Sequence, residues 1–107
     1  SRDFTFISNV VQANIKALCS DKIEKHQVFN VACNEQTSLK QLVNAITTEL
    51  QSDVQAVYGA ERAGDVKHSL ADISKAKLML NYHPEISFQD GLKQTITYFK
   101  TILKDVV

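Results

Sequence analysis

Apolar side chains recur at helical spacing in four stretches of the chain, and this pattern predicts four amphipathic helices. The first helix follows Ser8 or Asn9, because either residue is an acceptable N-cap. The second carries the clearest start signal, since Ser38 and Gln41 form a capping-box pattern ahead of an apolar seam. We expect the helices to cover residues 9–19, 38–51, 72–80 and 87–106.

The apolar seams also predict which side of each helix faces a core. The third helix is expected to begin at Asp72 and to end at Asn81, which tolerates the left-handed conformation, shortly before Pro84. The positions expected to be buried are Val11, Ile15, Leu18 and Cys19, widened by Val10, Ala13 and Ala17; Leu39, Leu42, Val43, Ile46 and Leu50; and Leu92, Ile96, Phe99, Leu103 and Val106.

Three short runs rich in β-branched and aromatic residues predict strands at residues 3–7 (DFTFI), 28–32 (VFNVA) and 54–58 (VQAVY). Residues 61–69 are polar and follow neither period, so a loop is expected there. Three strands and four helices in 107 residues predict one α/β or α+β domain. Three short strands are too few to cover the apolar faces of four helices, and we expect part of this apolar surface to pack against another segment.

Composition narrows the class of protein. Twelve Lys and Arg balance twelve Asp and Glu, so the net charge is zero and neither nucleic acid nor an anionic membrane is an expected partner. The longest apolar run has three residues, whereas a membrane-spanning helix needs ~20. We therefore expect a cytoplasmic protein. The chain begins with Ser1 followed by a charged pair, which suggests a piece of a longer protein.

No familiar catalytic or metal-binding motif occurs in the sequence. The three glycines are isolated, so the sequence contains neither the Gly-rich fingerprint of dinucleotide-binding proteins nor a P-loop. His26, His68 and His83 lack the spacing of a zinc site, and no metal is expected. Cys19 and Cys33 are expected to be buried thiols. Neither cysteine has a basic residue next to it in sequence that could activate it, so no sequence motif supports a catalytic nucleophile.

Two polar groups are candidates for ligand binding. Arg2 and Asp3 open the first predicted strand, and Glu61, Arg62 and Asp65 lie close together in the predicted loop. A guanidinium offers paired donors for phosphate oxygens, and a carboxylate accepts hydrogen bonds from sugar hydroxyls. Together they could hold a nucleoside diphosphate. Loop arginines and aspartates are more often surface or turn residues, so the residues alone leave both interpretations open.

Three motifs occur in an order that resembles a known family. SRDFTFISNVVQAN at 1–14, VFNVACNEQTSLKQL at 28–42 and ERAGDVKHSLADISKAKLMLNYHP at 61–84 are similar to the C-terminal third of nucleotide-sugar epimerases and dehydratases of the extended short-chain dehydrogenase/reductase family. One departure is Asn81, where the family usually has Gly. The resemblance implies that residues 1–107 form the C-terminal substrate-binding domain, a small mixed α/β lobe that normally packs on an N-terminal Rossmann domain.

The resemblance also implies roles for particular residues. Arg2 and Arg62 match arginines that contact the nucleotide diphosphate, and Asp65 matches an aspartate that binds the ribose hydroxyls. Ser69 matches a pocket position whose small side chain leaves room for an N-acetyl group, and the wording of the motifs is most similar to bacterial UDP-N-acetylglucosamine 4-epimerases. Asp3 is expected to anchor the backbone around the strand.

The reaction implied by the resemblance is NAD-dependent 4-epimerisation of a UDP-sugar, with interconversion of UDP-N-acetylglucosamine and UDP-N-acetylgalactosamine favoured. The family's Gly-rich NAD loop and Tyr-x-x-x-Lys pair are missing here, so NAD is expected to bind the N-terminal part, and residues 1–107 alone are expected to be inactive. Expected partners are the UDP-sugar, the Rossmann domain and a second enzyme copy in a homodimer. Two alternatives stay open: the substrate lobe of a related dehydratase, reductase or decarboxylase, and a stand-alone binding domain.

Overall fold

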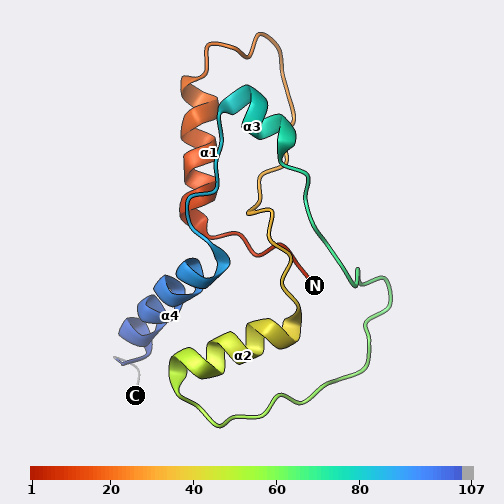
Figure 1. Ribbon diagram of the computed structural model, residues 1–107, viewed down its shortest axis with the longest axis vertical. Coiled ribbons are helices and arrows are strands. Elements are labelled where there is room, and N and C mark those ends of the chain that lie inside the picture. The colour runs from red at the N-terminus through yellow and green to blue at the C-terminus, as the bar shows by residue number, and fades with distance from the viewer. Residues whose placement is uncertain (105–107) are drawn as a thin grey trace.

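Four helices form the regular part of the computed structural model, which describes residues 1–104 (Figure 1). They lie close to the predicted bounds, so the four predicted helices are confirmed. Val106, which was expected to be buried, lies outside the described residues. The helices are α1 (Ile7–Cys19), α2 (Leu39–Leu50), α3 (Ser74–Leu80) and α4 (Phe88–Lys104).

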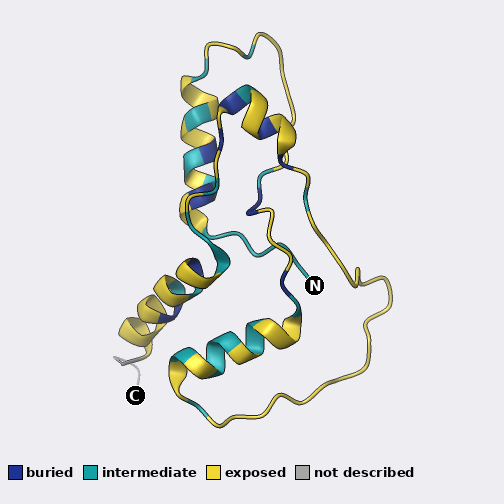
Figure 2. Ribbon diagram, in the orientation of Figure 1, coloured by how far each residue is buried: buried dark blue, intermediate teal, exposed yellow. Residues whose placement is uncertain are grey.

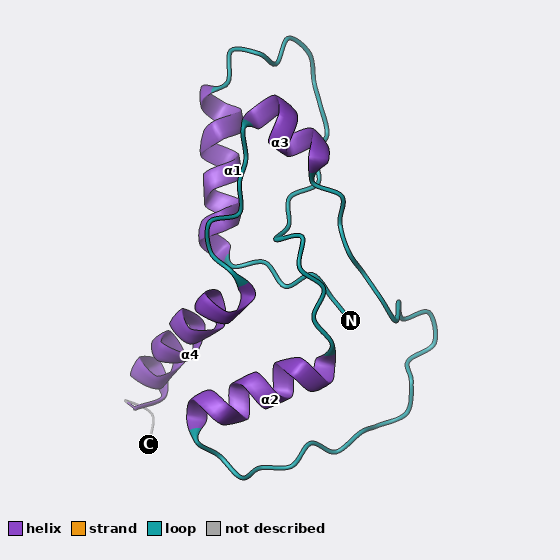
Figure 3. Ribbon diagram, in the orientation of Figure 1, coloured by secondary structure: helices purple, strands orange, loops and turns teal. Residues whose placement is uncertain are grey.

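None of the three predicted strands forms within the described residues (Figure 3). β-type pairing of the backbone is limited there to one isolated antiparallel bridge, in which Arg2 and Thr37 exchange N–H···O bonds of 2.8 and 2.9 Å. The prediction of strands at 3–7, 28–32 and 54–58 was therefore wrong. A strand needs a partner for its backbone groups, and even an isolated pair is marginal in water.

The helices pack in two pairs, α1 with α3 and α2 with α4 (Figure 1). The molecule is elongated, with principal extents of 52, 36 and 20 Å. The buried core belongs to the α1–α3 pair and to the segments beside it, and Tyr82 is its largest fully buried apolar side chain. This core consists of Ala13, Ala32, Ile73, Ala76, Leu80 and Tyr82.

The side of α1 that packs inward is not the one on which the predicted stripe is centred, and of the expected residues Ala13 is buried. Asn9 is 1% exposed, whereas the expected stripe of Val11, Ile15 and Leu18 is 46, 56 and 85% exposed. The reason is hydrogen bonding. The side chain of Asn9 accepts from the backbone N–H groups of Glu85 and Ile86 and donates to the carbonyl of Ile86. This side of the helix therefore binds backbone groups of residues 85–86, which are not paired in a sheet.

The α2–α4 pair is also less buried than predicted (Figure 2). None of the residues of α2, all of which the structure describes, is fully buried. On α4, Ile96 is buried as expected, but Phe99 and Leu103 are more than half exposed. Cys33 is a buried thiol, whereas Cys19 is exposed, contrary to expectation, because the end of α1 on which it lies faces solvent.

The predicted helix end at Asn81 is confirmed. Asn81 is the C-cap of α3 and adopts a left-handed conformation with φ of 55°. The chain then runs extended past His83 into α4. Among the described residues, no helix is both long enough and apolar enough to cross a bilayer.

Candidate functional site

The candidate site begins at the N-terminus, where Arg2 is fixed by its backbone. Its bridge to Thr37 ties the first residues of the chain to the segment that precedes α2. Thr37 is buried, and Ser38 starts α2 with the predicted capping box, accepting from the backbone N–H of Gln41 at 3.1 Å. Arg2 is thus attached to the start of a well-capped helix.

The second part of the site is the long exposed loop between α2 and α3 (Figure 2). Arg62 and Asp65 lie at the two ends of a tight turn, since the N–H of Asp65 donates to the carbonyl of Arg62 at 3.2 Å. Gly64 makes this turn possible because its φ is +79°, a conformation that side chains with a Cβ rarely adopt. The turn holds a guanidinium and a carboxylate on one short segment.

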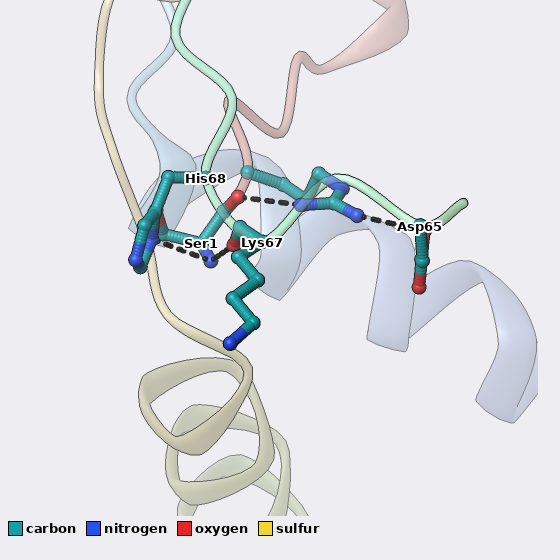
Figure 4. A network of polar contacts seen from close by, with 5 residues as sticks. Ser1, Asp65, Lys67 and His68 are labelled. Carbon is teal, nitrogen blue, oxygen red and sulfur yellow. Dashed lines mark hydrogen bonds and ion pairs between the residues drawn. The ribbon is translucent and has the colours of Figure 1, made fainter. Parts of the chain in front are cut away.

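An ion pair joins these two parts (Figure 4). Nη2 of Arg2 lies 3.2 Å from Oδ1 of Asp65, and Nη1 donates to the carbonyl of Ser1 at 2.9 Å. The side chain of Arg2 is 34% exposed and that of Asp65 is 60% exposed. Both groups therefore remain open to a ligand from solvent, and an exposed pair of this kind adds little to stability.

The residues after the turn return to the N-terminus and close the network (Figure 4). Oγ of Ser1 and Nδ1 of His68 are 2.8 Å apart, and the amino group of Ser1 donates to the carbonyl of Lys67. The backbone N–H of Ser69 donates to the carbonyl of Ser1 at 3.0 Å. The loop and the N-terminus, more than 60 residues apart in sequence, are thus held side by side.

A cleft of about 660 Å³ lies between the loop, the N-terminus and the start of α2. Arg2, Arg62 and Asp65 all line it, so the structure brings three of the four predicted site residues together. Ser69 is not among the lining residues and meets the network through its backbone. The volume lies within the range of small-molecule sites, which is roughly 300–1,000 Å³.

One wall of this cleft is apolar, and sequence reasoning did not identify it. Leu39 and Val43 from the first turns of α2 line the cleft together with Val57 and Tyr58 from the loop. The sequence placed Leu39 and Val43 on a core-facing seam and residues 54–58 in a strand, so it gave no signal that they meet. A cleft lined by both guanidinium groups and apolar side chains can take an anion that carries a flat, less polar group.

Asp3 does not line the cleft, but its carboxylate binds the backbone of a neighbouring segment. Its Oδ1 accepts from the N–H of Cys33 and its Oδ2 from the N–H of Asn34, both at 3.0 Å. Burial and then the charges of Glu35 and Asp3 raise the pKa of the Cys33 thiol above its ordinary value. Asp3 thus anchors the backbone, as expected.

The site has no features of a metal centre or of a nucleotide cofactor cradle in the described residues. No group of three or more His, Cys, Asp or Glu residues there could hold a metal ion. The one glycine with a positive φ, Gly64, leads into further loop and not into a helix, so it does not form a dinucleotide-binding turn. The chemistry that this cleft offers is anion and hydroxyl binding.

Comparison with known protein sequences relates the chain to nucleotide-sugar enzymes. The UDP-glucuronate 4-epimerase of Thermodesulfobacterium geofontis is 33% identical over 101 residues, which cover 94% of this chain and 30% of the relative. The UDP-N-acetyl-alpha-D-glucosaminuronate decarboxylase of Bacillus cytotoxicus is 27% identical over 114 residues, which cover 98% of this chain and 34% of the relative. The chain spans about a third of the length of the curated relatives it matches.

Solved structures share the fold. The UDP-glucose 4-epimerase of Thermotoga maritima, solved with UDP-glucose, superposes with a TM-score of 0.86 at 34% identity, covering 94% of this chain and 32% of that one. The UDP-glucuronic acid 4-epimerase of Bacillus cereus, solved with UDP-glucuronic acid and NAD, gives 0.87 at 29% identity with the same coverage. The expected fold class, the small C-terminal lobe of such enzymes, is confirmed apart from its strands.

The family assignment rests on nearly the whole sequence. A sequence model described as GDP-mannose 4,6 dehydratase matches residues 1–95 of the 107. The relatives and solved neighbours are UDP-sugar epimerases and related enzymes of the extended short-chain dehydrogenase/reductase group. The chain therefore belongs to the GDP-mannose 4,6 dehydratase family.

Proposed function

We propose that residues 1–107 are the C-terminal substrate-binding domain of a longer NAD-dependent UDP-sugar 4-epimerase. The observation that carries this proposal is the cleft, because it gathers Arg2, Arg62 and Asp65 from two distant segments. Several relatives and solved neighbours of the chain are UDP-sugar 4-epimerases, which supports the same function.

In this proposal the two arginines hold the diphosphate. A guanidinium donates paired N–H groups to phosphate oxygens, and two of them offset much of the charge of a diphosphate. Asp65 already accepts a hydrogen bond from Arg2, so its second oxygen is free to accept from a ribose hydroxyl. Remote binding of this kind orients the sugar, and orientation lowers the barrier to reaction.

NAD belongs, in this proposal, to an N-terminal Rossmann domain. The chain has no Gly-rich turn between a strand and a helix that would fit the cofactor's pyrophosphate. Its contribution is therefore geometric: it binds the nucleotide and positions the sugar. We expect residues 1–107 alone to show no turnover, and we expect the intact enzyme to be a homodimer.

The favoured sugar pair is UDP-N-acetylglucosamine and UDP-N-acetylgalactosamine. This part of the proposal depends on Ser69, whose small side chain would leave room for an N-acetyl group. In the intact enzyme, Ser69→Tyr should lower kcat/KM for UDP-N-acetylglucosamine by ~10-fold or more while that for UDP-glucose is kept, because a bulky ring fills the space of the N-acetyl group. Equal loss with both substrates would contradict the assignment of Ser69.

A dehydratase, reductase or decarboxylase with the same substrate lobe is the second candidate. The decarboxylase of Bacillus cytotoxicus matches nearly the whole chain, which favours keeping this candidate. Incubation of the intact enzyme with UDP-N-acetylglucosamine, followed by product analysis, separates the two. An epimer of unchanged mass supports the epimerase. Loss of water supports the alternative. A decarboxylase is tested with UDP-N-acetylglucosaminuronate instead, because UDP-N-acetylglucosamine has no carboxylate to release as carbon dioxide, and loss of carbon dioxide from that substrate also supports the alternative.

The decisive test of the cleft is Arg62→Ala in the intact enzyme. Losing one charge-assisted contact to the diphosphate should raise KM for the UDP-sugar and the Kd for UDP by ~10-fold or more, with a smaller change in kcat. Arg62→Lys keeps the charge but loses the paired donors, so it should recover only part of the affinity. Lys25→Ala in the exposed 21–27 loop is the control. Unchanged UDP affinity in Arg62→Ala would rule out the proposed site.

A further inference from the structure

Asp3 binds two consecutive backbone N–H groups, and this is an uncommon use of a side chain outside a helix start. Its two carboxylate oxygens accept separately from Cys33 and Asn34 at 3.0 Å each. Asn34 has φ of 60°, a left-handed conformation that the anion helps to stabilise by engaging its N–H. Successive N–H groups that converge in this way form an anion-binding concavity, and here a side chain of the protein fills it.

The neighbouring residue, Arg2, is fixed to the same segment by its backbone. Arg2 exchanges two backbone hydrogen bonds with Thr37, three residues beyond Asn34. Residues 2 and 3 therefore make four hydrogen bonds to residues 33–37, two by main chain and two by the Asp3 carboxylate. Removing the carboxylate takes away the two bonds to residues 33–34. The Arg2–Thr37 bridge and the contacts of Ser1 with residues 67–69 then hold this end of the chain with fewer restraints on the orientation of residue 2.

The side chain of Arg2 does not supply this restraint itself. Its guanidinium is bonded to the carbonyl of Ser1, the residue that precedes it in the chain, and to the exposed carboxylate of Asp65. An exposed ion pair holds a long side chain weakly. The direction in which Arg2 enters the cleft therefore depends on the backbone anchor and not on the contacts of its own tip.

We propose that Asp3 is a positioning residue for nucleotide binding: by holding the chain to Cys33 and Asn34, it sets the direction of the Arg2 guanidinium toward the diphosphate. Asp3 itself does not line the cleft and does not touch the ligand. This inference rests on the proposed function. It goes beyond that function by assigning a residue that acts only through Arg2.

The test is a double-mutant cycle in the intact enzyme, read as the Kd for UDP and as KM and kcat for the UDP-sugar. Arg2→Ala and Asp3→Ala are each expected to weaken UDP binding by ~10-fold, since the first removes the charged contact and the second removes the anchor that directs it. In the double variant, the loss should match that of Arg2→Ala alone, because Asp3 has no separate contact to lose. KM should rise while kcat stays within about twofold.

Asp72 provides a matched control. It too is a carboxylate that accepts a backbone N–H, from Ser74 at 2.9 Å at the start of α3, but it lies away from the cleft. Asp72→Ala should lower the melting temperature without changing the Kd for UDP. Asp3→Asn keeps one acceptor and should weaken UDP binding by ~3-fold, intermediate between wild type and Asp3→Ala. This milder variant keeps the test available if Asp3→Ala fails to fold.

The outcomes separate this inference from the proposed function. If Arg2→Ala leaves the Kd for UDP unchanged, the proposed site is overturned, and the role of Asp3 with it. If Arg2→Ala weakens binding but the Asp3 variants do not, only the role of Asp3 is overturned. The same holds if the two losses multiply in the double variant, because Asp3 would then act independently of Arg2.

Discussion

The α1–α3 half of the chain and the α2–α4 half are each built on one pair of helices, but they are held in different ways. In the first half, side chains of α1 bind backbone groups: Asn9 makes three such bonds to residues 85–86, and Gln12 makes two to His83. In the second half the helices meet through apolar side chains, and a cleft of about 760 Å³ stays open between them.

This difference shows that hydrophobic pattern alone does not decide which surfaces are buried in this chain. Most of the predicted apolar stripe of α1 is exposed while the side that carries Asn9 is buried, because segment 81–86 needs partners for its backbone groups. The seams of α2 and α4 are correctly amphipathic, yet much of their apolar surface stays exposed. In the described residues, directional hydrogen bonds give the tighter packing.

The largest expected effect comes from breaking the Asn9 contacts. Asn9→Ala in the 107-residue chain should lower the free energy of unfolding by about 2–4 kcal/mol, because three partly buried backbone hydrogen bonds are lost at once together with the packing of a buried side chain. Urea unfolding followed by circular dichroism measures this change. Asn14→Ala on the same helix is the matched control, since Asn14 is exposed. It should change stability by less than about 0.5 kcal/mol. Similar losses in both variants would show that the two halves do not differ as described.

The same contrast explains which parts of the fold could be predicted from the sequence. Helices were predictable because their signals are local: an apolar period, the Ser38 capping box and the left-handed Asn81. The inward side of α1 was not predictable, because it packs against a segment about 75 residues away in sequence. The backbone groups of that segment bind polar side chains of α1. Strands were overpredicted because β-forming residues need a partner strand, and none pairs with them among residues 1–104.

The candidate site divides in the same way. Arg2, Arg62 and Asp65 could be proposed from side-chain chemistry and from the order of motifs. Their closeness in space depends on the left-handed turn at Gly64 and on the backbone bridge at Arg2. Neither feature can be predicted from the spacing of these residues in the sequence. The apolar wall of the cleft could not be foreseen, since Leu39 was assigned to a core-facing seam.

The next largest effect is expected where the two halves join. A Cβ on Gly91 of α4 would lie 2.7 Å from Cβ of Phe6, next to the start of α1. Gly91→Ala should therefore destabilise the chain by about 1–2 kcal/mol, because the overpacking cost exceeds the gain in helix propensity. Gly59→Ala is the control, as nothing lies within 4 Å of its Cβ position. A stabilised Gly91→Ala variant would show that Phe6 can move to make room for the added methyl group.

A smaller effect is expected within the second half. Ser38→Ala removes the hydroxyl that accepts from the N–H of Gln41, so it should cost about 1 kcal/mol in unfolding free energy. The loss should appear mainly as faster hydrogen exchange in the first turn of α2. Ser8→Ala is the comparison, because the start of α1 has no side-chain cap. If Ser8→Ala is equally destabilising, the capping box does not distinguish α2 from α1.

The smallest effect concerns pH and belongs to the first half alone. Burial raises the pKa of the Cys33 thiol above its ordinary value of 9.0 and the pKa of the Tyr82 hydroxyl above 10.0. Well below pH 9 both groups are neutral in the folded and unfolded chain, so their full stabilisation is present. As pH rises further, the unfolded chain loses its protons first, and stability falls until the raised folded-state pKa values are passed.

Two variants can show how much of the loss of stability at alkaline pH is due to the Cys33 thiol. Urea unfolding between pH 8 and 10.5 should show a shallower decline in Cys33→Ala than in wild type, because the variant has one fewer group that ionises only on unfolding. Cys19 is exposed, so Cys19→Ala should keep the wild-type slope. Tyr82 donates its hydroxyl hydrogen to the carbonyl of Ala32 at 2.7 Å and accounts for the decline that remains. Equal slopes in all three proteins would mean that the buried thiol does not contribute to the alkaline limit of the α1–α3 half.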